Sequence, residues 1–306
     1  MVENSDNRIR RPFPGPGQAG LLVLAFLGVQ IACSFVVMFV LVVVAAVQKR
    51  GGAAPEMPPS ALLAANVLAF ATVAAWALAQ TRGRWREILL GGRAGGASWL
   101  AALPLLLGTT LLVTEGSNLL QMVLPVPASI AKLMQGATDV SAHPVVALLL
   151  VVVLAPIGEE FLFRGIILRG LLERLRPWSA IGLSTALFAV MHLNPWQVPA
   201  AVGFGVLCGW VYRRTRSLAL CILLHLLNNA AAIYAGQLPW PIPGLNGGPG
   251  RVEHLPWWLV ATGAVALGLG WALFRHTTQK LLEPPPLPAP EGAAIAVEDP
   301  VVSTGL

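Results

Sequence analysis

The sequence predicts an all-α fold, a polytopic transmembrane helical bundle of about eight spans. Hydrophobic residues make up 56% of the 306 residues and charged residues only 11%, against about 25% charged in an average soluble domain. The mean hydropathy is +0.71. Apolar runs of roughly 17 to 25 residues, the length of a membrane-spanning helix, recur at about 20–47, 59–80, 97–123, 144–168, 178–194, 197–212, 217–236 and 256–275.

Composition divides the chain into five segments. Residues 1–19 are polar and rich in Pro and Gly, and residues 283–306 are rich in Pro, so we expect both tails to be disordered. Residues 20–143 are expected to form the N-terminal transmembrane helices. Polar residues inside apolar runs concentrate in 144–236, and 237–282 is expected to hold an irregular outer loop and the last transmembrane helix.

The lysines and arginines predict the orientation in the membrane. With a cytoplasmic N-terminus, the outer segments hold four of the twenty and one lies inside a span, whereas the cytoplasmic segments hold fifteen. We therefore expect a multi-pass protein of the cell membrane, taken to be a bacterial inner membrane, with both termini cytoplasmic. The net charge of +6 follows from this topology and from attraction to anionic lipid, and it does not indicate nucleic-acid binding. The cytoplasmic set is Arg8, Arg10, Arg11, Arg82, Arg84, Arg86, Arg93, Arg169, Arg174, Arg176, Arg213, Arg214, Arg216, Arg275 and Lys280.

The fourth apolar run contains two adjacent carboxylates and a guanidinium, in Glu159-Glu160-Phe161-Leu162-Phe163-Arg164. A charge at the bilayer centre costs about 3 kcal/mol, so such residues indicate a functional site. Helical spacing allows an i,i+4 ion pair between Glu160 and Arg164. Glu159 is rotated by roughly 100°, faces elsewhere and stays free to act as a base. The alternative is that all three residues form a buried salt-bridge network that fixes helix packing.

Two histidines lie on later apolar runs, in Phe188-x-x-x-His192 and His225-x-x-x-Asn229. His225 and Asn229 lie one turn apart, so an imidazole and an amide can point at the same atom, as an oxyanion site requires. A lone intramembrane histidine is more often a hydrogen-bond partner between helices. Two histidines together with a free Glu159 favour a catalytic site.

Depth in the membrane tests this grouping. At 1.5 Å per residue, Glu159 and His225 lie ~15 Å and ~14 Å from the nearest cytoplasmic arginines, whereas His192 lies ~22 Å from the start of its span. Glu159 and His225 therefore match in depth, and His192 joins them only if its helix is tilted or starts late.

The three cysteines carry no chemical signal of their own. Cys33, Cys208 and Cys221 fall within apolar runs without C-x-x-C spacing. We expect small buried hydrophobic residues, with neither a disulfide framework nor a zinc knuckle.

Taken together and in this order, the three motifs resemble those of the CAAX prenyl protease type 2 family, also called the CPBP or Abi family. The resemblance covers roughly 144–236 and implies that this segment is the catalytic core of an intramembrane endopeptidase. It implies hydrolysis of a membrane-associated protein or peptide by water that a glutamate and a histidine activate. On this sequence, it implies that Glu159 is the base, that His192 helps to hold the water, and that His225 and Asn229 stabilise the oxyanion. The supporting residues would be Glu160, Arg164 and Phe188.

Metal dependence is left open by the residues. The family has also been described as metal-dependent, and His192, His225 and Glu159 offer zinc ligands. The sequence lacks H-E-x-x-H, the spacing diagnostic of a metalloprotease. We favour a glutamate mechanism without a cofactor, with a divalent metal such as zinc as the alternative.

Two other classes of function compete with the protease. A non-enzymatic immunity or scaffold protein would keep the fold, but the full set of motif residues argues against it. A proton-coupled transporter could use Glu159 and the histidines as a relay, but the sequence shows no inverted pair of broken helices. The family name does not identify the substrate or require that it be prenylated.

Overall fold

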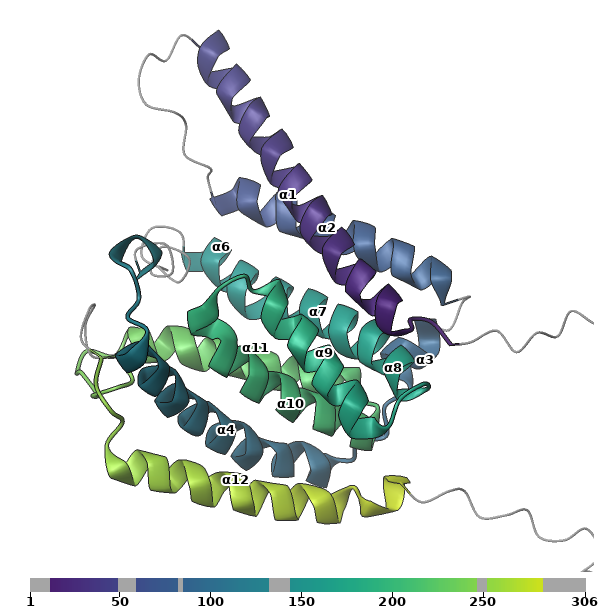
Figure 1. Ribbon diagram of the computed structural model, residues 1–306, viewed down its shortest axis with the longest axis vertical. Helices are drawn as coiled ribbons and strands as arrows, with labels where there is room; N and C mark the ends of the chain where they lie inside the picture. Colours follow the sequence, from purple (N-terminus) through teal and green to yellow (C-terminus); the bar gives the residue numbers. More distant parts are fainter. Residues whose placement is uncertain (1–11, 49–58, 82–84, 132–143, 247–251, 283–306) are drawn as a thin grey trace, which may run out of the picture.

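The computed structural model describes residues 12–48, 59–81, 85–131, 144–246 and 252–282. Within these ranges every regular element is a helix, which confirms the predicted all-α polytopic bundle (Figure 1). The elements are α1 (Pro16–Val47), α2 (Pro59–Gln80), α3 (Trp85–Leu90), α4 (Gly96–Val123), α6 (Pro144–Leu148), η1 (Leu149–Leu154), α7 (Ala155–Glu160), η2 (Phe161–Leu168), α8 (Arg169–Leu172), α9 (Pro177–Met191), η3 (Pro195–Gln197), α10 (Val198–Thr215), α11 (Leu218–Gly236), α12 (Trp257–Thr277) and η4 (Gln279–Leu282).

Each of the eight predicted apolar runs is helical, with ends within four residues of those expected. In the described part of the chain, six helices are long and apolar enough to cross a membrane. The exceptions are α9 and α10. The 15 residues of α9 reach about 22 Å against a hydrocarbon core of about 30 Å, and the last turn of α10 carries Arg213 and Arg214. The short α3, in a segment expected to be a loop, was not predicted.

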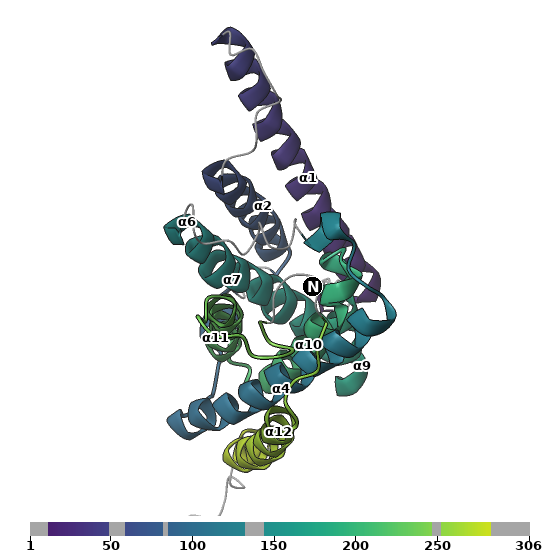
Figure 2. The same ribbon diagram turned by 90° about the vertical axis from the view of Figure 1, so that its left-hand side faces the viewer.

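The helices are arranged in layers (Figures 1 and 2). The helices α1 and α2 pack together on one side of the bundle, and α4 and α12 pack together on the other. Between these pairs lie α9, α10, α11 and the long helix that runs from α6 to α8. This long helix supplies much of the core, because nearly every side chain from Leu162 to Leu171 is buried.

Two glycines on α10 allow α9 to pack closely against α10. A Cβ atom at Gly205 would lie 2.8 Å from the Thr185 side chain, and one at Gly209 would lie 2.9 Å from the Ile181 side chain. Small residues spaced by four allow transmembrane helices to approach closely. This spacing packs the helix that ends beside His192 tightly against the centre of the bundle.

The helix that carries both glutamates is irregular on either side of them, because η1 and η2 are π-helical. In η1 the Ala155 N–H donates to the Leu150 carbonyl, five residues earlier. In the same i to i−5 pattern, residue 156 would donate to the Val151 carbonyl, but Pro156 has no N–H. The helix therefore supplies no backbone hydrogen bond to that carbonyl in this pattern. The Asn229 side chain of α11 donates to that carbonyl instead, at 2.9 Å. A neighbouring helix thus satisfies the backbone group that the proline leaves free, as membrane interiors require.

The ends of the chain differ in part from expectation. The first helix begins at Pro16, inside the predicted N-terminal tail, since proline is favoured in a first helical turn. Residues 1–11 and 283–306, which make up most of the predicted disordered tails, lie outside the described residues. The described part of the outer loop is mostly irregular, and α4 anchors it: Asn118 Nδ2 donates to the Gly244 carbonyl and Leu255 N donates to Glu115, both at 2.8 Å.

Candidate active site

Glu160, at the end of α7, is the centre of a buried polar cluster. Its side chain is fully buried, and its Oε1 accepts hydrogen bonds from Arg164 Nη1 and from His225 Nδ1, both at 2.8 Å. The predicted i,i+4 ion pair between Glu160 and Arg164 is confirmed. The structure adds that the same carboxylate oxygen also holds a histidine from α11.

Aromatic rings enclose the Arg164 guanidinium. Its Cζ lies 5.0 Å from the centre of the Phe188 ring and 5.9 Å from that of Phe204. Its Nη2 also donates to the Gly205 carbonyl at 3.3 Å. A buried cation is stable only when paired and hydrogen-bonded, and Arg164 is both. Phe204 was not predicted, because an aromatic residue in an apolar run carries no signal of its own.

The two glutamates lie on opposite sides of the His225 ring. A carboxylate only accepts, so the short contact to Glu160 assigns the proton to Nδ1 of the neutral ring. The other nitrogen, Nε2, lies 3.9 Å from Glu159 Oε2. This is too long for a direct hydrogen bond, but one water can bridge such a separation. Glu159 was expected to face away from the Glu160–Arg164 pair, and what the sequence did not predict is that one imidazole lies between both carboxylates.

Solvent access distinguishes the two carboxylates. The Glu159 side chain is 15% exposed, whereas that of Glu160 is 0% exposed. A base that activates water must be reached by water, and Glu159 meets this condition better.

His192 follows the last residue of α9 and is partly buried. Its Nδ1 lies 2.8 Å from the Phe188 carbonyl, which only accepts, so Nδ1 is the donor and Nε2 of the neutral ring is an acceptor. The Phe188 ring lies edge-on to both imidazoles, with centroids 4.8 Å from His192 and 6.2 Å from His225. The same ring contacts Phe163 of η2 at 5.1 Å. Phe188 therefore links the two histidines, although they come from different helices.

Asn229 belongs to a polar chain that crosses three helices. Thr110 of α4 donates to Asn228 Oδ1 at 3.1 Å, Asn228 donates to Asn229 Oδ1 at 3.3 Å, and Asn229 donates to the Val151 carbonyl. An asparagine amide has two N–H donors, and the bond to Val151 uses one. Asn228 and Thr110 were missed, although adjacent asparagines in an apolar run are a visible signal.

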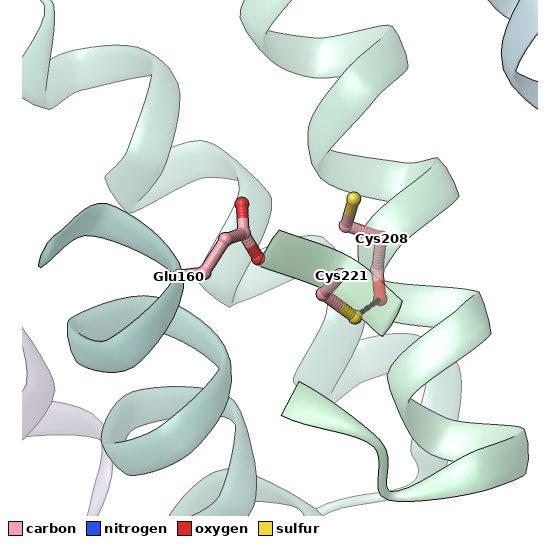
Figure 3. Close-up of side chains that lie close together, drawn as sticks. All are labelled: Glu160, Cys208 and Cys221. Carbon is pink, nitrogen blue, oxygen red and sulfur yellow. Dashed lines mark hydrogen bonds between the residues drawn. The ribbon is translucent and has the colours of Figure 1, made fainter. Parts of the chain in front are cut away.

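The buried thiols lie beside the same cluster (Figure 3). In the described part of the chain, one set of three potential ligands has its atoms within 4.8 Å of one another: Glu160, Cys208 and Cys221. Both cysteines are buried and free, as predicted, and Cys221 Sγ donates to the Cys208 carbonyl at 3.5 Å. The same prediction is wrong for Cys33 of α1, which is only partly buried. The guanidinium of Arg164, bonded to the same carboxylate, repels a cation at this position.

The three zinc ligands considered from the sequence can be compared with the ligand spacing of a tetrahedral zinc site. Ligand atoms around a tetrahedral zinc lie about 3.3 Å apart, whereas His225 Nε2 and Glu159 Oε2 are 3.9 Å apart. His192 is not part of the ligand group that gathers within 4.8 Å among the described residues. As they lie, His192, His225 and Glu159 do not form a closed metal site.

An apolar groove of about 340 Å³ lies between α2, α3, α7, η2 and α11, along the helix that carries both glutamates. Ile157 and Gly158 precede Glu159 in the chain and line this groove, and Phe70 and Ala74 of α2 form its opposite wall. The side chains that line it are all apolar. An apolar segment or chain can therefore lie along the helix that carries Glu159 and Glu160, although neither carboxylate lines the groove.

Residues 141–231 match the family of Rce1-like type II CAAX prenyl endopeptidases. The match confirms the resemblance predicted for 144–236 and includes all seven residues of the three motifs. No curated protein and no solved structure matches the chain. With its apolar helices, the chain is an integral multi-pass membrane protein, and its segment 141–231 is similar to CAAX-type intramembrane endopeptidases.

Proposed function

We propose that this protein is a CAAX-type intramembrane endopeptidase that cleaves a membrane-associated protein or peptide with a water molecule held between Glu159 and His225. The observation that carries the proposal is that each nitrogen of one buried imidazole faces a carboxylate. Glu160 Oε1 lies 2.8 Å from His225 Nδ1, and Glu159 Oε2 lies 3.9 Å from Nε2. One carboxylate fixes the ring, and the other has solvent access and is free to take a proton. This division of roles suits water activation.

Charge balance guides the proposal for the reacting form of the cluster. Glu159 and Glu160 carry two negative charges and Arg164 carries one positive charge. For the reacting form we propose one further proton on the cluster, which balances these charges. With that proton on Nε2, His225 is an imidazolium held by Glu160, and Glu159 is the free base.

The reaction follows from this arrangement. The water oxygen attacks the scissile carbonyl carbon while Glu159 takes a proton from the water. The imidazolium of His225 stabilises the oxyanion that forms, together with the second N–H of Asn229. Breakage of the C–N bond then requires a proton on the leaving amine, which Glu159 supplies. His192, through its acceptor Nε2, orients the attacking water, and no metal ion is required.

We further propose that the groove beside Gly158 binds an apolar part of the substrate near the scissile bond. An isoprenoid chain or apolar side chains of a membrane-anchored tail both suit its lining. Burial of apolar area there would position the peptide bond against Glu159 before the chemical step.

The orientation remains the one proposed from the charges, with both termini in the cytoplasm of a bacterial inner membrane. The start of α1 and the ends of α8, α10 and α12 lie at one end of the bundle (Figure 1). This end carries the arginines of 169–176 and 213–216 together with Arg275. Substrates would therefore be cut from the cytoplasmic side.

The test uses purified protein in liposomes and quenched-fluorescence peptides that end in a CAAX sequence, either farnesylated on the cysteine or not. Wild-type protein should cleave at least one peptide. Glu159→Gln should not, because an amide cannot take the proton, and Glu173→Gln, outside the site, should behave as wild type. Comparing the peptide termini in membranes of cells with wild-type or Glu159→Ala protein then identifies the native substrate. Full turnover by purified Glu159→Gln protein would refute the mechanism. If the two membranes contain the same peptide termini, so that none depends on Glu159, the result would favour a scaffold protein.

A further inference from the structure

A second apolar groove, of about 400 Å³, lies between α4, α9, α10 and α12. It shares no lining residue with the groove beside Gly158. Its walls include Leu105 and Val113 of α4, which are separated by ~12 Å along that helix. Val206 of α10 lines it and is 37% exposed, so the groove faces the surroundings of the bundle.

Tryptophans mark one end of this groove. Trp178 begins α9, Trp210 lies near the end of α10 and Trp271 lies near the end of α12, and all three line the groove. Trp178 and Trp271 are 59% and 48% exposed. Tryptophan is enriched at the level of the lipid headgroups, so this end of the groove lies at the membrane surface.

Arginines stand directly over two of these rings. Arg214 Cζ lies 5.5 Å from the centre of the Trp210 ring, and Arg275 Cζ lies 5.2 Å from that of Trp271. Each arginine follows its tryptophan by one helical turn, so the cations extend from the mouth of the groove toward the polar side of the interface.

Among the described residues, no acid forms an ion pair with the cations at this mouth. Arg213 and Arg275 both lie close enough to Arg214 to repel its guanidinium. Arg214 is nevertheless held in place, since its Nε donates to Thr278 Oγ1 at 2.5 Å and its Nη2 donates to the Arg275 carbonyl at 2.9 Å. The ion pairs seen among the described residues involve other cations. Three like charges held together attract an anion.

We propose that this groove binds one anionic phospholipid, with its phosphate on Arg214 and Arg275 and an acyl chain along the wall between Leu105 and Val113. A free phosphate would meet the arginines but leave the apolar groove empty. A zwitterionic lipid would fill the groove but gain less from the charge cluster. An anionic lipid matches both parts at once, and it is present wherever this surface meets a cytoplasmic leaflet.

The lipid site is connected to the catalytic site through α10. Val206, Leu207 and Trp210 of this helix line the lipid groove. On the same helix, Phe204 packs on His225 with centroids 4.5 Å apart, and the Gly205 carbonyl accepts from Arg164. A bound lipid would therefore support the helix that encloses the buried ion pair, whether or not the protein is a protease.

The test is native mass spectrometry of the full-length protein in detergent with phosphatidylglycerol and phosphatidylcholine of identical acyl chains. Wild-type protein should retain one phosphatidylglycerol in preference to phosphatidylcholine, and millimolar inorganic phosphate should not displace it. Arg275→Gln should weaken phosphatidylglycerol binding about five-fold, the value of one interfacial charge. Arg86→Gln is the matched control, because Arg86 also lies 5.2 Å above a tryptophan, Trp85, but away from the groove.

A second variant tests the apolar part of the site. Val206→Trp should fill the groove and weaken binding of both lipids, and if it fails to fold, Thr109→Trp fills the same space from α4. Equal retention of the two lipids, or an equal loss in Arg275→Gln and Arg86→Gln, would show only general attraction to a basic surface and overturn the proposal. Displacement by inorganic phosphate alone, or unchanged binding in the groove variants, would overturn it as well.

Discussion

The bond from Asn229 to the Val151 carbonyl gives two separable predictions for one residue. Asn229→Ala removes the donor that replaces the missing N–H of Pro156 and leaves a partly buried carbonyl without a partner. Such a loss costs about 1–3 kcal/mol, and interhelical hydrogen bonds in membranes average about 0.6 kcal/mol. We therefore expect Asn229→Ala to lower the free energy of unfolding by about 1 kcal/mol.

Pro156→Ala should rescue this loss. An alanine restores an N–H at position 156, in register to donate to Val151 along the π-helix. In the Pro156→Ala background, Asn229→Ala should then cost much less than in the wild type. Asn228→Ala is the matched control: Asn228 bonds to Asn229 and Thr110 but not to Val151, so Pro156→Ala should leave its cost unchanged.

The assay is equilibrium unfolding in mixed micelles, followed by helical circular dichroism, with peptide cleavage measured on the same samples. If Asn229 also stabilises the oxyanion, the double variant regains stability but remains impaired in kcat. If its role is only to satisfy Val151, both readouts recover. A strictly additive cycle, with no rescue of stability, would refute the backbone argument.

Four further predictions test other parts of the structure. Glu160→Gln and Arg164→Met should each cost about 3–5 kcal/mol, because each leaves a buried charge unpaired, and their double variant should unfold with a loss well below the sum; additivity in the same unfolding assay would deny the pairing. Cleavage should survive exhaustive chelation, and stoichiometric zinc whose removal and return switch activity off and on would show a metalloenzyme instead. Ala74→Trp should fill the groove beside Gly158 and raise KM for the peptide at least ten-fold, with little effect from Ala75→Trp outside it; equal KM values would exclude the groove from substrate binding. A single cysteine introduced in 213–216, on a background without native cysteines, should react with an impermeant thiol reagent only from the cytoplasmic side, and labelling from the outside would invert the topology.

Local sequence patterns were sufficient for the helices and for one ion pair. Hydropathy depends on each residue alone, so the eight apolar runs were located within four residues. The pair Glu160 and Arg164 was found because an i,i+4 contact needs only helical geometry. The contact is present although η2 is π-helical, because Arg164 Nη1 still lies 2.8 Å from Glu160 Oε1.

Contacts between helices could not be predicted from the sequence. The position of His225 between both glutamates depends on how α11 packs against α7, which no spacing along one helix encodes. The partner of Asn229 depends on the π register of η1, although Pro156 was a visible sign that some backbone carbonyl would need a donor. Phe204 lies beside Arg164 because of how α10 packs in the bundle, where Gly205 and Gly209 allow a close approach to α9.

The buried salt-bridge network and the proposed catalytic site share Glu160 and His225. Glu160 contributes to both, since the oxygen that pairs with Arg164 also orients His225, so loss of activity in Glu160→Gln alone would not separate the two roles. Glu159 separates them, because its closest contact to the network is the 3.9 Å approach to His225. Glu159→Gln should therefore abolish turnover while changing the free energy of unfolding by no more than about 1 kcal/mol. A large loss of stability in that variant would mean that Glu159 serves packing, and the base would then have to be sought elsewhere.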